Sequence, residues 1–143
     1  MRYLSIIFVL SLLLCSCATV QQETLLPSQQ LTAPITPNKT RVIFFNTSNK
    51  VLYSDTSWRI GIKIDGKGVA NLHFNQYVQI ELDPGNHVLE LSHVDVFTFK
   101  DKYDFVVGAE TMYVAVYNSP ISTKYKVLPE KPENFESNFR PIF

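Results

Sequence analysis

Residues 58–74 read WRIGIKIDGKGVANLHF, and this stretch decides the fold class. Every second residue from position 58 to position 64 is apolar, while Arg, Gly and Lys stand between them. This period of two is typical of a β-strand with one buried face. The Asp-Gly pair at 65–66 favours the positive φ angles of a tight turn, after which residues 69–74 return as a second strand. The stretch therefore predicts a β-hairpin.

Short strand-like runs continue on both sides of this hairpin. Residues 41–46 (RVIFFN) are apolar enough to be buried on both faces, and residues 83–86 (DPGN) predict a turn. The sequence nowhere shows the apolar stripe of a helix over more than two turns. Further strands are expected at residues 77–82, 87–96, 97–107, 111–117 and 124–128. Seven or eight strands within residues 41–128 predict an all-β domain, a β-sandwich.

The N-terminus has the pattern of a bacterial lipoprotein signal peptide. A positive charge at Arg2 precedes an apolar run over residues 3–14, which is too short for the roughly 20 residues that span a bilayer. Residues 14–17 (LCSC) resemble a lipobox, which implies that residues 1–16 are removed and that Cys17 is lipidated. Cys15 fits this motif less well, because Leu14 would then stand where a small residue is required. The alternatives are an ordinary secretory signal, or a redox or metal site formed by Cys15 and Cys17.

The lipid anchor predicts where the protein resides. Two or three acyl chains hold a protein to a membrane lastingly, because each buried methylene contributes about 0.8 kcal/mol. Ala18 stands where an Asp signals inner-membrane retention in the lipoproteins that this motif resembles, so the outer membrane is favoured. We therefore expect a protein of the bacterial cell envelope, anchored in the outer membrane by lipid and facing the periplasm.

Segments of different composition flank the expected domain. Residues 17–40 contain Cys17 and then a stretch rich in Gln, Thr and Pro, which predicts a flexible tether. Residues 129–143 contain three prolines and isolated aromatic residues, which predicts an irregular tail. The tail is either a strap whose rings cap the open end of the sandwich or a partner-binding peptide. The strap is favoured, because Phe135, Phe139 and Phe143 would promote association if all three were exposed.

Three phrases resemble blocks of a bacterial lipoprotein family defined only as a domain of unknown function. They are residues 60–68 (IGIKIDGKG), 77–89 (YVQIELDPGNHVL) and 106–116 (VVGAETMYVAV). The resemblance covers residues 41 to about 128 and implies a prealbumin-like (transthyretin-like) sandwich; the broader group includes small PEGA-type envelope modules. It implies no activity. The shared residues have structural explanations: Gly66 and Gly85 permit turns, and His87 is placed to hold a loop by a side-chain hydrogen bond.

Composition excludes several classes of function. The chain has 143 residues, with 13 Lys plus Arg against 13 Asp plus Glu. This balance provides no basic field for a nucleic-acid backbone, so no nucleic-acid partner is expected. Once residues 1–16 are removed and Cys17 is lipidated, no thiol remains for catalysis or for a disulfide.

The residues that carry chemistry do not form a recognisable catalytic or metal-binding motif. A zinc site would require His73, His87 and His93 to converge with a carboxylate, but their spacing does not support this. Asp101 and Asp104 alternate with lysines that cancel their field, so a solvated hairpin tip is expected there rather than a calcium site. The G-x-S-x-G and S-x-x-K motifs and a phosphate-binding loop are also missing from the sequence. We expect a protein that is not an enzyme and has no cofactor or metal.

The remaining candidates are binding surfaces. Tyr53 and Trp58 could form an aromatic patch for a protein or a glycan, although Trp58 also fits the buried phase of its strand. The leading hypothesis is a membrane-anchored module that binds another envelope component, a protein rather than a glycan. The alternatives are an accessory subunit of a secretion or surface machine and a lipoprotein that binds a small ligand or a glycan.

Overall fold

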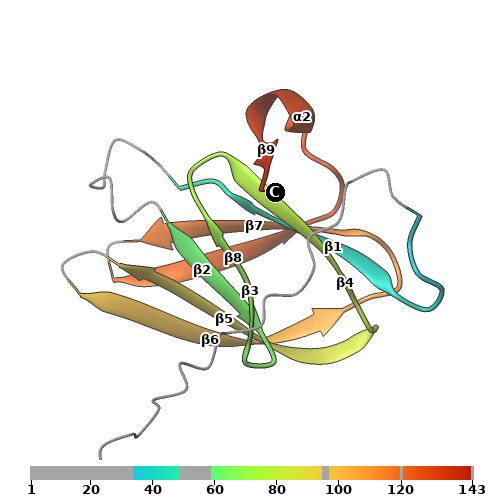
Figure 1. Cartoon of the computed structure of the whole chain (residues 1–143), viewed down its shortest axis with the longest axis horizontal. Helices are drawn as coiled ribbons and strands as arrows, with labels where there is room; N and C mark the ends of the chain where they lie inside the picture. Colours follow the sequence, from blue (N-terminus) through green and yellow to red (C-terminus); the bar gives the residue numbers. More distant parts are fainter. Residues whose placement is uncertain (1–33, 49–58, 95–96, 120, 143) are drawn as a thin grey trace, which may run out of the picture.

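The computed structural model describes residues 34–48, 59–94, 97–119 and 121–142. The expected signal peptide, Cys17, most of the tether, Tyr53 and Trp58 lie outside these ranges. The described residues form a nearly all-β structure of two sheets (Figure 1). Within them, no helix is long and apolar enough to cross a membrane.

The five-stranded sheet contains, in spatial order, β8 (Ser122–Leu128), β7 (Met112–Ser119), β1 (Thr40–Asn46), β4 (Gln76–Leu82) and β9 (Arg140–Pro141). The four-stranded sheet contains β3 (Lys67–Leu72), β2 (Ile60–Ile64), β5 (Gly85–Val94) and β6 (Thr98–Val107). β1 pairs with β7 in parallel, and β4 pairs with β9 in parallel. The other neighbouring strands are antiparallel.

The hairpin predicted from residues 58–74 is present. Ile64 pairs with Lys67, so Asp65 and Gly66 form a two-residue turn. Their φ angles are 52° and 77°, as a type I′ turn requires. Ile60, Ile62 and Ile64 are buried as the alternation indicates. The expected strand count is also met, since eight strands of the described residues lie between Thr40 and Leu128.

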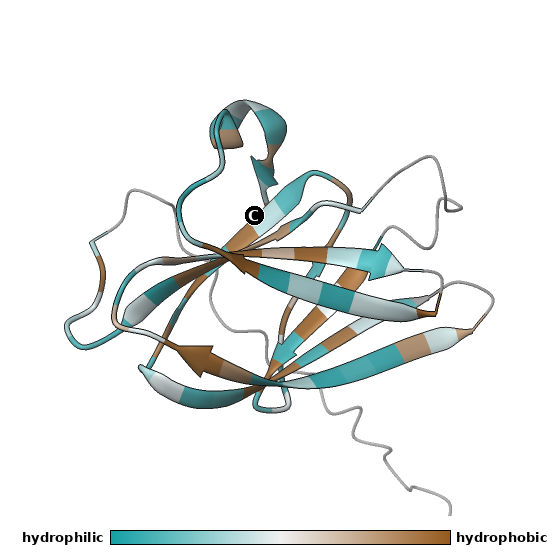
Figure 2. Ribbon diagram, turned by 180° about the vertical axis from the view of Figure 1, so that it is seen from behind, coloured by the Kyte–Doolittle hydropathy of each residue, from teal (hydrophilic) through white to brown (hydrophobic). Residues whose placement is uncertain are grey.

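The core lies between the two sheets. Apolar side chains from both inner faces meet there, and the rings of Phe44 on β1 and Phe105 on β6 pack with their centroids 5.8 Å apart. Figure 2 shows hydrophobic and hydrophilic bands alternating along the strands, as expected where one face of each sheet is buried. The all-β sandwich expected from the sequence is therefore the architecture of the described chain.

The first strand is buried on both faces, as its composition predicts. Val42 and Phe44 point into the core, whereas Ile43 and Phe45 belong to a second apolar cluster on the outer side of the five-stranded sheet. Phe135 covers this second cluster and is fully buried.

The C-terminal segment is more ordered than its sequence indicated. It contains the helical turn α2 (Phe135–Asn138) and strand β9, whose Arg140 N–H donates to the carbonyl of Asn75 at 2.8 Å. Its aromatic rings cover the outer face of the five-stranded sheet rather than an open end of the sandwich. The reason is that β1, buried on its inner side, also presents apolar residues on its outer side, and these require a cover.

Strand β6 is continuous, so the expected hairpin tip at residues 100–102 is not present. Asp101 lies in the inward phase of β6, and its Oδ2 accepts the backbone N–H of Thr123 on β8 at 2.7 Å. The hydroxyl of Tyr103 donates to the carbonyl of Thr123 at 2.6 Å. Nδ1 of His93 lies 2.7 Å from Oγ1 of Thr123. Asp101 is therefore one of three side chains that join the edges of the two sheets around Thr123.

Candidate functional site

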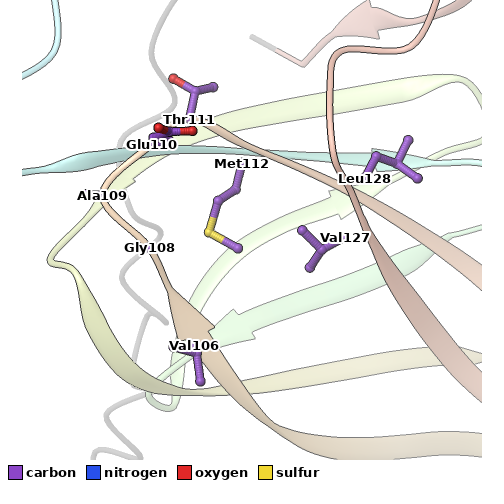
Figure 3. Close-up of a pocket in the computed structure, with 8 residues that line it drawn as sticks. All are labelled: Val106, Gly108, Ala109, Glu110, Thr111, Met112, Val127 and Leu128. Carbon is purple, nitrogen blue, oxygen red and sulfur yellow. The ribbon is translucent and has the colours of Figure 1, made fainter.

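A groove opens at one corner of the sandwich, where β6 ends, β7 begins and β8 ends (Figure 3). Its volume is about 460 Å³. Its apolar walls are the side chains of Val106, Met112, Val127 and Leu128, and residues 108–111 form its connecting loop. We call this the corner groove.

The corner groove exists because the edges of the two sheets separate here. Val127 is paired with Val114, a fully buried core residue, so Val127 occupies the inward-facing register of β8. Even so, 42% of Val127 is exposed, because β6 no longer covers it. Next to the groove, the hydroxyl of Tyr125 on β8 still links these edges, because it donates to the carbonyl of Asp104 on β6 at 3.3 Å. Beyond that link, part of the interior is accessible to solvent.

The opposite wall of the groove is apolar as well. Val106 points outward near the end of β6 and is 64% exposed. Met112 is partly buried and packs against the main core. Exposed apolar side chains that gather at one place are typical of contact sites rather than of ordinary surface. Glu110 is the one ionisable residue among the eight that line the groove, which suits binding better than proton transfer.

The groove lies at the end of the sandwich where the chain enters from the N-terminal side. The hydroxyl of Thr40, the first residue of β1, donates to the carbonyl of Gly108 in the groove loop. Lys39 forms an ion pair with Asp83 in the neighbouring turn, with 2.8 Å between Nζ and Oδ1. Lys39 and the first residue of β1 are therefore fixed next to the groove.

His87 connects two turns near this end of the molecule. Its Nδ1 lies 2.7 Å from Oδ2 of Asp65, and its Nε2 lies 2.9 Å from the carbonyl oxygen of Asp83. Partial burial alone would lower the pKa of His87, but these hydrogen bonds and the nearby carboxylates raise it overall. The Val88 N–H and the His87 ring hold the pKa of Asp65 below its ordinary value. The expectation that His87 holds a loop is confirmed, and it holds two.

The three histidines do not meet. His73 is exposed beyond the end of β3, His87 holds the two turns, and His93 is buried beside Thr123. The ring of His93 also stacks on Phe99, with the centroids 4.8 Å apart. Among the described residues, no group of three His, Cys, Asp or Glu side chains is placed to hold a metal ion.

The sequence singles out Tyr53 and Trp58 as a possible binding surface. Both residues lie outside the described residues. The sequence pattern does not mark the groove residues Val106 and Val127 as site residues, because an apolar residue in an alternating strand is normally assigned to the core.

Comparisons with known proteins find no match to this chain. The chain matches no protein-family model, no curated protein and no solved structure. Its functional interpretation therefore depends on its own sequence and geometry.

Proposed function

We propose that this chain is a non-enzymatic, lipid-anchored protein of the bacterial cell envelope whose β-sandwich binds another envelope protein. The sandwich is of the prealbumin-like type suggested by the sequence resemblance. Cys17 carries the lipid in the outer membrane, and the domain faces the periplasm. The corner groove is the contact site.

One observation supports this proposal above the others. Val127 and Met112 lie in inward-facing registers, yet they reach solvent beside the exposed Val106. Apolar side chains of a partner would complete the packing that the separated sheet edges leave unfinished. Aromatic rings, which stack on sugars, do not occur among the eight lining residues, which favours a protein over a glycan.

The position of the groove suits an anchored protein. The hydrogen bond from Thr40 to Gly108 ties the groove loop to the first residue of β1. The preceding chain leads to Cys17 over 22 intervening residues, numbers 18–39. The groove thus belongs to the end of the domain that the tether enters, and a flexible tether of this length lets the groove meet a partner about 25 Å from the membrane surface.

Site-specific photo-crosslinking in cells tests the contact site. A benzophenone amino acid at Val106 or Val127 is expected to give one discrete crosslinked protein. The matched control is Lys126, which neighbours Val127 but points to the opposite side of β8, beside the outer-cluster residue Ala115. Crosslinking at Lys126 should be absent, and Val106→Glu should abolish the product formed at Val127. Equal yields at all three positions, or a product that Val106→Glu does not reduce, would contradict a site in the groove.

The anchor is tested separately. Cys17→Ser should abolish labelling with radioactive palmitate and release the chain from the membrane fraction. Labelling that persists in this variant would disprove lipidation at Cys17. The crosslinking experiment reports on the groove alone and the labelling experiment on Cys17 alone. A failure of the contact site can therefore be distinguished from a failure of the lipid anchor.

A further inference from the structure

Two large apolar side chains project into solvent from neighbouring hairpin ends. Ile121, directly before β8, is 79% exposed, and Phe97, directly before β6, is 72% exposed. These are the highest exposed fractions of large apolar side chains among the described residues. We call Phe97 and Ile121 the apolar tips. Apolar side chains that are this exposed and lie together are typical of a surface that contacts another molecule.

The two hairpin ends are joined by buried side chains. The ring of His93 stacks on Phe99, which lies two residues after Phe97, with the centroids 4.8 Å apart. Nδ1 of the same His93 lies 2.7 Å from Oγ1 of Thr123, which lies two residues after Ile121. The starts of β6 and β8 accordingly lie together at one end of the sandwich, on the left in Figure 1. The apolar tips therefore project from the same end of the molecule.

The interior at this end is already filled. His93 and Thr123 are both buried, so they occupy the space between the sheets behind the apolar tips. The hydroxyls of Ser119 and Ser122 lie 2.6 Å apart and close the hairpin on either side of Ile121. The exposure of the tips thus does not reflect an unfilled position in the core.

Each apolar tip is followed three residues later by an exposed lysine. These are Lys100 on β6 and Lys124 on β8. Lysine combines an apolar stem with a charged head, which suits the boundary between acyl chains and headgroups. Asp101 lies beside Lys100, and its carboxylate accepts the backbone N–H of Thr123. No net positive charge is required here, because the apolar tips are the groups that would enter the lipid.

The shape of this end suits a lipid surface. A partner protein would need a recess for each projecting side chain, whereas acyl chains adapt to side chains that enter the interface. A lipid surface is also what the proposed anchor at Cys17 would hold next to the domain. Of the two kinds of occupant, the membrane therefore fits the apolar tips better.

The apolar tips and the corner groove lie at opposite ends of the sandwich. Strand β5 begins with Gly85, opposite Val107 near the groove loop, and ends with Val94, opposite Thr98 beside a tip. Ten strand residues span about 34 Å. The tether of 22 residues spans about 25 Å as a random coil and more when it is extended. The tips can therefore rest on the membrane while the tether reaches the other end of the domain.

We infer that Phe97 and Ile121 insert into the lipid surface to which the chain is anchored, so that the corner groove points away from the membrane. This orientation rests on the lipid anchor of the proposed function. Two apolar side chains alone would hold a protein to a membrane only weakly. The anchor compensates for this, because it keeps the tips at a high effective concentration next to the lipid.

Fluorescence quenching by lipids provides the test. An environment-sensitive fluorescent amino acid replaces Phe97 or Ile121 in the full lipidated chain, which is reconstituted into vesicles of phosphatidylethanolamine and phosphatidylglycerol. A fraction of these lipids carries a nitroxide quencher on the acyl chain. The probe should be quenched at both positions. The matched control is the same probe at Val106, which is 64% exposed but lies at the groove end, and its fluorescence should not change.

A second pair of variants tests whether the two tips act together. Phe97→Asp should lower the quenching of a probe at Ile121 about fivefold, because a carboxylate is costly to move into lipid. Phe97 is exposed, so this variant is expected to fold. Ile35→Asp, at an exposed apolar residue shortly before β1, is the matched control and should leave the quenching unchanged.

Vesicle flotation separates this inference from the proposed anchor. Flotation with quenching at the tips and none at Val106 supports the orientation. Flotation without quenching at the tips would overturn the orientation alone and leave a protein as the occupant of the tips. Equal quenching at the tips and at Val106 would also overturn it, since the domain would then have no preferred orientation. A chain that does not float would contradict the anchor and the orientation together.

Discussion

The outer face of the five-stranded sheet is apolar and covered, whereas the outer face of the four-stranded sheet is polar and open. On the first, Ile43, Phe45 and Ala115 lie beneath Phe135 and Phe139 of the C-terminal segment. On the second, charged and small polar residues lie in rows across the strands, among them Lys63, Glu90 and Lys102. The strands themselves differ, because β1 is buried on both faces whereas β2 alternates between buried and partly exposed residues.

This difference between the two outer faces indicates which surfaces are available for function. The protein uses its own C-terminal segment to cover the apolar face, so that face is structural. The corner groove, among the described residues, stays accessible and is lined by apolar side chains.

The covered face should be the most sensitive to substitution, and Phe135→Ala tests this. Phe135 is fully buried and packs against Phe45 and Tyr77, with ring centroids 5.3 Å and 5.1 Å away. Removing the ring leaves a cavity, so the free energy of unfolding should fall by about 3–5 kcal/mol. Chemical denaturation followed by fluorescence measures the loss.

The control for this variant is Phe97→Ala. Phe97 is 72% exposed, so the same substitution there should change stability by less than about 0.5 kcal/mol. A small loss at Phe135, comparable with that at Phe97, would mean that the C-terminal segment is not part of the folded core.

Substitutions at the edge between the two sheets should cause the second largest loss in the free energy of unfolding, and Thr123→Val tests this. Thr123 is fully buried, and its hydroxyl interacts with Nδ1 of His93 at 2.7 Å. Valine keeps the shape but removes this interaction from a buried site, which should cost about 1–3 kcal/mol. Thr98→Val at an exposed position of β6 is the matched control and should be nearly neutral. If both substitutions have the same effect in denaturation experiments, the contact between the Thr123 hydroxyl and His93 does not hold the edges together.

Sequence reasoning succeeded where the determinants are local. The alternation of Ile60, Ile62 and Ile64, and the turn chemistry of Asp65 and Gly66, specify the hairpin within a few residues. The burial of both faces of β1 also follows from its own composition. The pairing of β1 with β7 does not, because parallel strands are brought together by contacts that are distant in the chain.

Other features depend on relations between distant strands. Asp101 interrupts an apolar pattern, so the sequence suggested a solvated turn there. Its carboxylate instead accepts a hydrogen bond from a backbone N–H of β8. Phe135 lies in a Pro-containing segment without periodicity, and only the outer face of β1 explains its burial. The corner groove results from how far the ends of β6 and β8 separate, which no periodicity within one strand reports.

The turns that join the strands should contribute less than the packed layers and should depend on pH, which His87→Gln tests. The pKa of His87 is raised above 6.5 in the folded state, so its stabilising contribution is complete below that value and is lost as pH rises through the raised pKa. The pKa of Asp65 is lowered below 3.8, so the contribution of Asp65 is complete above that value and is lost in stronger acid. The pair is therefore most stabilising between these two values.

Denaturation at two pH values measures this contribution. His87→Gln should lose up to about 1 kcal/mol at about pH 5.5 and less at about pH 8.5, because Asp65 is half exposed and solvent screens the ion pair. His73→Gln at an exposed histidine is the control and should show no such difference. A larger loss at the higher pH would contradict the raised pKa of His87.

The polar outer face of the four-stranded sheet should contribute least to stability, and Lys102→Gln tests this. Lys102 forms an ion pair with Glu90, but its side chain is 69% exposed. Exposed ion pairs contribute about 0–1 kcal/mol, so the free energy of unfolding should change by less than about 0.5 kcal/mol in denaturation experiments. A loss comparable with that of Thr123→Val would mean that the charged rows hold the sheet together. A small change would instead show that the fold does not depend on the ion pair between Lys102 and Glu90.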